Sequence, residues 1–539
     1  MLAEIAPLAA DGWRSMQLRF QADGGFVLLF IVNITASWAI WWLWRFVLTP
    51  RLFPLEVKEY PYWIPGENFI IRTRFSKMSQ AKDKEPLQLT LFGFTMYFIS
   101  RAEDVTEAYR NTRTLTFDEF YQRVFFSMGT SKESVLKLFA QRSKEAEDAE
   151  SKQGKPVAQI LRELQISQLQ PGPNLDSLEL AELAYLDSHT QLDSLRTSRY
   201  SYQNIRGGDG ATDVSECVEL SLWHWCTDIT TRASQRSLFG SALDRIDPDL
   251  PDRFLEFDDL SWKMLYQFPD FLARDLLKKR DYLRGVLKTF CDLPTKERND
   301  AETWVIKSTE ESCRNLGIPS EDTASVLLIL YWGTNTNTRK AAFWLISHLL
   351  QNPTLVDALR TEMAPAFGRD DTIIDLGHLH SRCPQLEAAW NETMRLHGAA
   401  ASIRTVTADT VIGGRTLRAG RRLVIPYRQL HLEPSIFGED VKTFRPDRFL
   451  SRKTESGERL RLEHFRPFGG GSTICSGRHL VKRMVAILVA LLLRRYDISM
   501  AGEQQSLPVE DEWRPVLGIA DPKPGHDVRI RLTPRKVVP

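Results

Sequence analysis

The chain has 539 residues, of which 43% are hydrophobic; since one hydrophobic core stops growing at about 250–300 residues, one large compound domain or two domains are expected. Its 70 Lys and Arg residues balance 69 Asp and Glu residues, so there is no basic excess to bind nucleic acid. The 6 cysteines contain no CxxC pair, which argues against a zinc site or a disulfide scaffold.

An uncharged apolar run covers residues 26–44. A helix rises about 1.5 Å per residue, so a helix over this run would span most of a hydrocarbon core of roughly 30 Å. Tryptophans gather at its C-terminal end, where an aromatic belt would meet the lipid headgroups. The run begins too late and is too long for a signal peptide. We therefore predict an N-terminal segment over residues 1–25 and a transmembrane anchor over residues 26–48, with the rest of the chain in the cytosol because more basic residues follow the run than precede it.

Several prolines punctuate the segment that follows the apolar run. Because proline resists helix formation, we predict a stiff hinge over residues 49–70. A large domain over residues 71–539 then makes up the remainder of the chain.

This domain is predicted to begin with a hairpin and to continue mainly as helices. Residues 87–100 carry β-branched and aromatic residues on both sides of a glycine, which indicates two strands. The pattern from residue 101 to about residue 310 is mainly helical. Within it, residues 219–240 have apolar residues at helical spacing, and we predict a helix that stops at Gly240.

A long helix is predicted over residues 320–350, where apolar residues at both ends indicate burial on most sides. Its middle, residues 333–338, reads Gly-Thr-Asn-Thr-Asn-Thr. These residues are poor helix formers that bond back to the backbone and loosen the hydrogen-bond ladder. A buried helix tolerates such a stretch where a functional group fits against it, so we expect these residues to serve a function.

A later helix carries Glu392 and Arg395, which are three residues apart and share one face. Taken alone, such a pair is usually exposed and contributes about a few tenths of a kcal/mol. Residues 402–431 and the tail from residue 501 then read as short strands separated by turns.

Cys475 lies in a glycine-rich stretch, residues 465–480, that leads into an apolar helix over residues 480–496. Glycines let the backbone approach a flat macrocycle and direct N–H groups at a sulfur. The N-terminus of the following helix also lowers the pKa of a thiol. A lone cysteine in a glycine turn is often only a small buried residue. Here a phenylalanine, three glycines and the cysteine keep one register, which favours a thiolate that binds haem iron.

In this register the chain resembles the cytochrome P-450 family, whose haem loop reads Phe-Gly-x-Gly-x-Arg-x-Cys-x-Gly. The resemblance implies a mainly α fold with small β-sheets, preceded here by one transmembrane helix, and haem b as the cofactor. It makes Cys475 the axial iron ligand. The loop residues that it places at the haem are Phe468, Gly469, Gly471 and Gly477.

Thr473 stands where the family usually has a basic residue, so the haem propionates need another partner. Arg404 occupies the place of a propionate-binding arginine in the family and is the first candidate. Arg466 and His464 are further candidates. His431 matches a family position that supports the structure, and we do not expect it to be a ligand.

The family also carries a Glu-x-x-Arg motif, a Pro-x-Arg-Phe motif and the haem loop in this order. Glu392, Arg395 and Arg448 match the charged positions, which implies a buried, charge-paired triad that fixes the loop beneath the haem. Its role is structural, because three buried charges are tolerated only while all of them are paired.

The polar middle of the long helix matches the family pattern Ala/Gly-Gly-x-Asp/Glu-Thr-Thr, whose acid and alcohol supply protons for oxygen activation. With Gly333 in the first position, Thr336 takes the acid place and Asn337 the alcohol place, and Thr338 comes next. With Gly333 in the second position, Asn335 takes the acid place and Thr336 the alcohol place. The acid is missing in both readings. The stretch is similar to the branch of cholesterol and oxysterol 7α-hydroxylases and prostacyclin synthase, which have Asn in the alcohol place, and this favours the first reading.

The resemblance implies a monooxygenase that inserts one oxygen atom from O2 into a lipophilic substrate, with electrons from NADPH through NADPH-cytochrome P-450 reductase. The branch suggests a steroid, terpenoid or other polycyclic substrate, in a secondary-metabolite pathway. The missing acid leaves open a haem-thiolate isomerase or dehydratase that acts on a peroxide without a reductase. A membrane-bound scaffold that has lost catalysis is a third alternative. We expect a single-pass protein of the endoplasmic reticulum with a cytosolic haem-thiolate domain.

Overall fold

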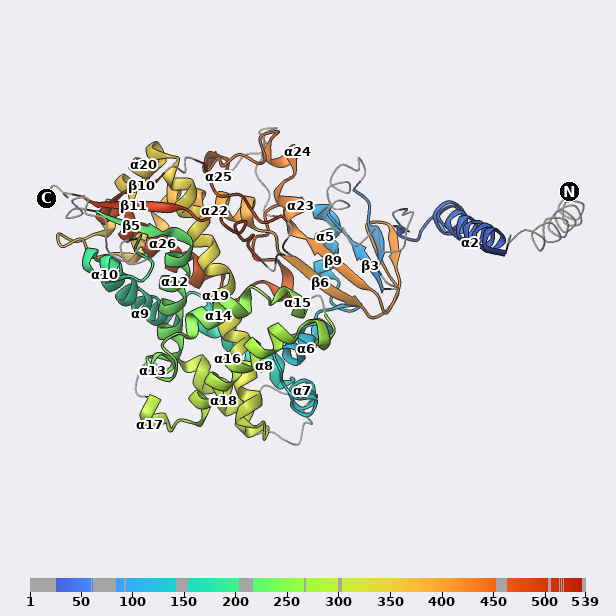
Figure 1. Cartoon of the computed structure of the whole chain (residues 1–539), viewed down its shortest axis with the longest axis horizontal. Coiled ribbons are helices and arrows are strands. Elements are labelled where there is room, and N and C mark those ends of the chain that lie inside the picture. Colours follow the sequence, from blue (N-terminus) through green and yellow to red (C-terminus); the bar gives the residue numbers. More distant parts are fainter. Residues whose placement is uncertain are drawn as a thin grey trace, which may run out of the picture. The chain divides into compact units, whose positions relative to one another are not determined.

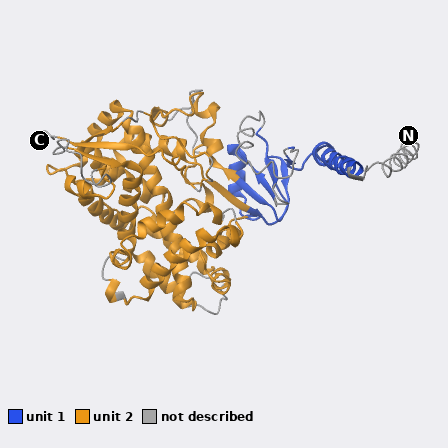
Figure 2. Ribbon diagram, in the orientation of Figure 1, with its two compact units in different colours: residues 1–115, 405–424 blue, residues 116–404, 425–539 orange. Residues whose placement is uncertain are grey.

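Helices are the main elements of this computed structural model and small sheets complete it, which confirms the mainly α fold (Figure 1). The chain forms two compact units, residues 1–115 with 405–424 and residues 116–404 with 425–539 (Figure 2). The structure describes residues 26–59, 61, 84–91, 94–141, 154–202, 217–265, 268–298, 303–451, 463–502, 506–512, 514, 516 and 518–535.

The first unit begins with consecutive helical segments, α2 (Phe26–Leu43), η1 (Trp44–Leu48) and α3 (Thr49–Leu52). Residues 28–52 are long and apolar enough to cross a membrane, and no part of their most apolar window is buried in the protein. The helix continues past Pro50, where the sequence predicted a hinge from residue 49. Pro50 comes two residues after the π-helical segment η1, at the beginning of α3. The predicted N-terminal segment and most of the predicted hinge lie outside the described residues.

Short strands form the body of the first unit, in the order β1 (Lys58–Glu59), β2 (Leu87–Leu91), β3 (Phe94–Phe98) and β9 (Arg422–Pro426). β2 and β3 are antiparallel, with Leu87 opposite Phe98, which confirms the predicted hairpin. β3 runs parallel to β9. A second hairpin, β7 (Thr410–Ile412) with β8 (Arg415–Leu417), turns at two glycines with positive φ.

The second unit is built around two long helices, α19 (Ser320–Leu350) and α26 (Arg478–Arg495). α19 has the bounds that the sequence predicted, and Glu321 and Asp322 in its first turn favour a helix start there. α12 (Leu222–Phe239), α16 (Arg274–Asp292) and α22 (Pro384–His397) pack against α19. Buried apolar side chains of α12, α19, α22 and α26 form one continuous core. This core includes α19 from Ala341 onward, and Phe465 and Phe468 of the loop before α26 pack against it.

One predicted helix begins later than expected. β5 (Val218–Ser221) pairs with β11 (Arg529–Pro534), which also pairs with β10 (Tyr496–Met500). The helical reading of residues 219–221 is therefore wrong, because their backbone groups bond to a strand more than 300 residues later in the chain. α12 starts at Leu222, capped by Ser221, and ends at Gly240 as predicted.

The remaining elements complete the two units. Their bounds are α5 (Ala102–Arg110), β4 (Leu115–Thr116), α6 (Asp118–Ser127), α7 (Lys132–Phe139), α8 (Val157–Leu169), α9 (Pro173–His189), α10 (Leu192–Thr197), α13 (Ala242–Ile246), α14 (Leu250–Asp258), α15 (Trp262–Leu265), η3 (Asp270–Leu272), α17 (Thr295–Arg298), α18 (Trp304–Asn315), α20 (Pro353–Met363), η4 (Ala364–Ala366), α21 (Leu376–Ser381), β6 (Ala401–Val406), α23 (Tyr427–His431), α24 (Pro434–Phe437), α25 (Asp447–Ser451) and η5 (Gly471–Thr473).

Candidate functional site

Cys475 lies between η5 and the start of α26. The loop before it turns tightly at Gly469 and Gly471, whose φ angles of 78° and 60° lie in the left-handed region that favours glycine. The Cys475 N–H donates to Phe468 O at 3.0 Å and closes the loop. A Cβ added to Gly477 would lie 3.9 Å from Cys475 Sγ, so this glycine is next to the sulfur.

Opposing effects act on the thiol of Cys475. Desolvation by the surrounding protein raises its pKa, and the net shift is upward, although hydrogen bonding to the backbone N–H groups of Gly477 and Arg478 and the positive charges of Arg478 and Arg162 oppose it. The side chain is nevertheless exposed. Protein atoms lie close to the thiol and desolvate it, but its side chain is still exposed. A ligand can therefore reach it.

Two arginines contact the same loop, one from a strand and one from a helix. Arg404, on β6, is buried, contacts Thr473 Oγ1 and lies with its guanidinium carbon 5.2 Å from the centre of the Phe117 ring. Arg162, on α8, contacts Ser472 O. Sequence reasoning did not single out Arg162, because no motif marks an arginine on an ordinary helix.

Of the two further candidates near the loop, Arg466 donates from Nε to Glu463 O at 3.0 Å. Its guanidinium is thus turned toward its own segment of the chain. His464 lies two residues before Arg466 in the same segment.

Glu392, Arg395 and Arg448 lie together in the interior. Arg395 forms two parallel hydrogen bonds to the Glu392 carboxylate, of 2.7 and 2.8 Å. Arg448 Nε lies 3.4 Å from Glu392 Oε1, and Arg448 also pairs with Asp440 at 2.6 Å. Arg395 donates its remaining hydrogen bonds to the carbonyls of His431 and Val441, at 3.0 and 2.8 Å. Every charge of the three is therefore paired, which buried charges require.

His431 connects this triad to the loop before Cys475. Its Nε2 accepts from the Arg466 N–H at 3.1 Å, so its Nδ1 carries the proton and donates to Gly398 O at 3.3 Å. Burial, together with the positive charge of Arg395, lowers the pKa of His431 to about 3. Both ring nitrogens are engaged, which agrees with the expectation that His431 is not a ligand.

The middle of α19 presents one accessible strip, formed by Gly333, Thr334 and Asn337, while the residues between them are buried. Asn337 Oδ1 accepts the Ile519 N–H at 2.8 Å. This bond fixes the amide orientation and leaves Nδ2 as the group of the side chain that can donate a hydrogen bond. A Cβ on Gly518 would overlap the Asn337 carboxamide, so the close approach requires glycine there.

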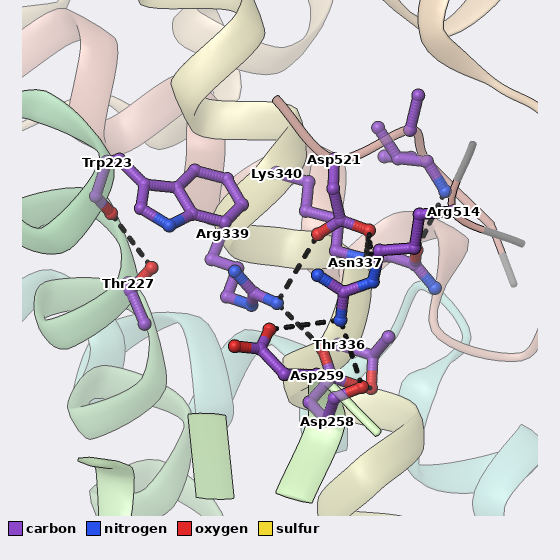
Figure 3. Close-up of polar contacts among 12 residues, drawn as sticks. Trp223, Thr227, Asp258, Asp259, Thr336, Asn337, Arg339, Lys340, Arg514 and Asp521 are labelled. Atoms are coloured by element: carbon purple, nitrogen blue, oxygen red, sulfur yellow. Dashed lines mark hydrogen bonds and ion pairs between the residues drawn. The ribbon is translucent and has the colours of Figure 1, made fainter. Parts of the chain in front are cut away.

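The two threonines beside Asn337 have different partners. Thr338 Oγ1 donates to Thr334 O of its own helix at 2.7 Å. Thr336 Oγ1 lies 2.8 Å from Trp332 O and also reaches Asp258 Oδ1, at the end of α14, at 2.9 Å (Figure 3). The place that the first reading gives to an acid therefore holds a hydroxyl that is bonded to a carboxylate from another helix.

A buried charge network surrounds Thr336 (Figure 3). Asp258 pairs with Arg339 at 2.7 Å, Arg339 lies 3.7 Å from Asp521, and Asp521 pairs with Lys340 at 2.9 Å. Burial raises the pKa of Asp521, but its basic neighbours outweigh burial and the net shift is downward. Sequence reasoning missed both aspartates, because each is a single acid in an ordinary segment and only the folded chain brings it to α19.

These residues fit a haem that is held through a thiolate. The N–H groups around Cys475 favour the thiolate and tune its donor strength. Arg162 and Arg404 bring cations to the loop, where carboxylates of a ligand can pair with them. Within the described ranges, no group of three or more His, Cys, Asp and Glu residues is placed to hold a metal ion by itself.

A family model described as cytochrome P-450 matches residues 222–528. A cytochrome P-450 monooxygenase of Penicillium oxalicum is 24% identical over 90% of this chain and 96% of its own. The 7-alpha-hydroxycholest-4-en-3-one 12-alpha-hydroxylase of Homo sapiens is 28% identical over 64% of this chain and 71% of its own. Among solved structures, the retinoic acid bound cyanobacterial CYP120A1 shares the fold with a TM-score of 0.65, at 17% identity over 89% of this chain and 100% of that chain.

Proposed function

The chain belongs to the cytochrome P-450 family, and we propose on this basis that it is a membrane-anchored haem-thiolate monooxygenase of lipophilic substrates. In the reaction a substrate C–H bond and O2 become C–OH and one water molecule. NADPH is oxidised to NADP+ and one further proton is consumed. NADPH-cytochrome P-450 reductase passes the two electrons of NADPH to the enzyme.

The observation that carries the proposal is the loop that presents Cys475: its N–H closes the loop on Phe468 O at 3.0 Å, the side chain is exposed, and Gly477 lies next to the sulfur, where backbone N–H groups can bond to it. Hydrogen bonds of this kind keep a sulfur ligand deprotonated and set how strongly it donates electrons. Haem b, when bound, supplies an iron whose thiolate ligand favours O–O cleavage. Cys475 would hold the haem iron through its sulfur, and Phe468, Gly469, Gly471 and Gly477 would let the loop lie against the ring.

The charged residues around the loop have two roles in this proposal. Arg404, from β6, and Arg162, from α8, pair with the haem propionates. Glu392, Arg395 and Arg448 brace the loop from below through His431. This support is structural, because the triad is buried and its charges are satisfied within the protein.

The residues in the middle of α19 act on the side of the haem where O2 would bind, which we call the oxygen side. Asn337 donates from Nδ2 toward the accessible side of the helix and thereby orients oxygen. Thr338 lines the same stretch. Thr336 connects it to the buried charges behind α19.

A steroid, terpenoid or other polycyclic compound, as in a secondary-metabolite pathway, is the proposed substrate. The similarity to a steroid 12-alpha-hydroxylase supports this class. The apolar helix over residues 28–52 supports a single-pass anchor, which in this proposal lies in the endoplasmic reticulum membrane with the haem domain in the cytosol. Such an anchor brings the enzyme to substrates that dissolve in lipid.

A reconstitution with purified holoprotein tests the proposal. A panel of steroids and terpenoids is first screened for substrates that shift the Soret band. Each such substrate is then incubated with and without NADPH, reductase and O2. We expect a hydroxylated product only in the complete mixture. Conversion of a peroxide substrate without NADPH and reductase would instead establish an isomerase or dehydratase.

A further inference from the structure

We propose that Asp258, at the end of α14, provides the carboxylate for proton delivery that α19 lacks, and that it acts through the hydroxyl of Thr336. The inference rests on the proposed function, because the reduction of oxygen is what consumes protons at this site. Asp258 is a positioning residue, since it reaches the oxygen side only through Thr336.

Asp258 is held firmly beside Thr336 (Figure 3). Its Oδ1 accepts hydrogen bonds from Thr336 Oγ1 at 2.9 Å and from Trp332 Nε1 at 3.2 Å, and its Oδ2 accepts one from Arg339 at 2.7 Å. The residue is 3% exposed. A buried carboxylate with donors on both oxygens keeps one orientation, so Oδ1 stays in contact with the hydroxyl.

The simpler role for a buried aspartate here is to neutralise Arg339. Asp521 is also 3% exposed and lies 3.7 Å from the same guanidinium. Among the described contacts, however, Thr336 bonds outside its own helix only to Asp258. Both aspartates are therefore equally buried and lie beside Arg339. Of the two, only Asp258 contacts the Thr336 hydroxyl among the described contacts.

Polar atoms without a partner extend this cluster. Among the described residues, Arg339 Nε and Nη1 and Asn335 Oδ1 are buried and make no hydrogen bond. Groups of this kind usually bind ordered water, and water transmits protons. Asp259, the next residue after Asp258, is exposed, so solvent comes close to the end of α14.

The proton transfer balances without a further reactant. Asp258 takes a proton from hydronium in the solvent, which becomes water, and passes it to Thr336 Oγ1, while that hydroxyl releases its own proton toward the side of α19 where O2 would bind. Asp258 is then again the carboxylate that pairs with Arg339. One proton has moved from solvent to the oxygen side and no electron has moved along this route; the electrons come from NADPH.

The test compares Asp258→Asn with Asp521→Asn in the reconstituted holoenzyme. We expect Asp258→Asn to lower the rate of product formation roughly 10²-fold, as the loss of a proton donor typically does, while NADPH consumption continues. Asp258→Glu restores product, because it keeps the acid. Asp521→Asn removes an equally buried charge from Arg339 and keeps the wild-type ratio of product to NADPH. Equal ratios for Asp258→Asn and Asp521→Asn would overturn the proposal.

Milder variants cover the case in which an aspartate variant does not fold. Thr336→Val lowers the ratio of product to NADPH as Asp258→Asn does, and Thr336→Ser restores it. The double variant of Asp258→Asn and Thr336→Val is no worse than either single variant, because both act on one route. A wild-type ratio in Thr336→Val would overturn the proposal.

Thermal unfolding gives a readout that does not depend on turnover. In a double-mutant cycle the substitutions at Asp258 and Thr336 are coupled, and those at Asp521 and Thr336 are additive. Additive behaviour in both cycles would contradict the contact itself. A wild-type enzyme without NADPH-dependent product would refute the proposed function, whereas an active wild type with an unaffected Asp258→Asn variant would refute only this inference.

Discussion

The backbone N–H of Ile519 and the absence of a side chain on Gly518 together fix the carboxamide of Asn337. Ile519 N–H holds Oδ1, and Gly518 leaves the room that the amide occupies. An amide in this place can donate a hydrogen bond from Nδ2, but it cannot pass a proton onward as a hydroxyl does. The proton route therefore needs a hydroxyl and an acid nearby, and Thr336 with Asp258 has both.

Gly518→Ala should displace the Asn337 carboxamide, because the added Cβ would occupy its place. The lost hydrogen bond to Ile519 costs about 0.5–1.5 kcal/mol, and the clash adds to this. Gly285→Ala is the control, since a Cβ there meets nothing within 4 Å. Thermal unfolding and the Soret shift on substrate binding measure the effect. Unchanged unfolding and binding in Gly518→Ala would show that the Asn337 orientation is not fixed in this way.

The residues around the Cys475 sulfur were easier to predict from the sequence than the residues around Thr336. Cys475 and its glycines are adjacent in the chain, so their spacing alone predicted one site. Asp258 and Thr336 are 78 residues apart, and no local pattern links them. The sequence correctly indicated that α19 has no acid of its own at this place, but it could not indicate that α14 would bring one.

At the scale of elements, α22, α25 and the loop before α26 depend on one carboxylate. Glu392 pairs with Arg395 and Arg448, and its Oε1 also accepts the Arg445 N–H at 2.9 Å. Removing its charge leaves two buried guanidinium groups short of a partner. The elements that carry the loop lose their common anchor with it.

Glu392→Gln should therefore lower the free energy of unfolding by about 3–5 kcal/mol, as the loss of one partner in a buried ion pair typically does. It should also release the haem. Glu310→Gln is the matched control: Glu310 is a buried partner of Arg298 at 2.8 Å, on a different helix. We expect this control to lose stability and to keep a full complement of haem. Denaturant unfolding and haem content per chain measure the two effects, and full haem content in Glu392→Gln would contradict the bracing role.

The connection through His431 predicts a pH dependence. Its pKa is about 3 in the folded protein, below the ordinary 6.5, so the unfolded state binds more protons between these values. The free energy of unfolding thus falls as the pH drops below 6.5, by at most about 1.4 kcal/mol per pH unit. His431→Gln keeps an acceptor and a donor but removes this titration.

Urea unfolding at pH 6.5 and at about pH 5 compares the two proteins. We expect the wild type to lose about 1.6 kcal/mol more than His431→Gln over this interval. His348 and His397, whose pKa values are also lowered by burial, contribute to both proteins alike. Equal losses would mean that His431 is not held neutral by its contacts.

Elements with a strong local pattern were predictable and paired strands were less so. α19 follows its apolar pattern over its full length, and the hairpin of β2 and β3 is local in the chain. β5 has the same apolar spacing as the helix after it, and only pairing with β11 makes it a strand. Long-range pairing of this kind leaves no mark within the segment itself.

At the scale of the whole molecule, the apolar helix over residues 28–52 predicts retention in membranes. An arginine near the middle of a transmembrane helix costs about 2.5–3.5 kcal/mol. Replacing both Ile34 and Ile40 by Arg should release the protein from membranes, while replacing both by Leu should not. The share that remains in the membrane after alkaline extraction measures this, and retention of the Arg variant would contradict a single-pass anchor.

The most direct test of the central claim, that the Cys475 thiolate holds the haem iron, is the absorption spectrum of the reduced protein with carbon monoxide. We expect the wild type to bind one haem per chain and to give the shifted Soret band of a thiolate-ligated haem. Cys475→Ser should lose this band, whereas Cys383→Ser, which changes another free cysteine, should keep it. A colourless wild type, or an unchanged band in Cys475→Ser, would contradict the account.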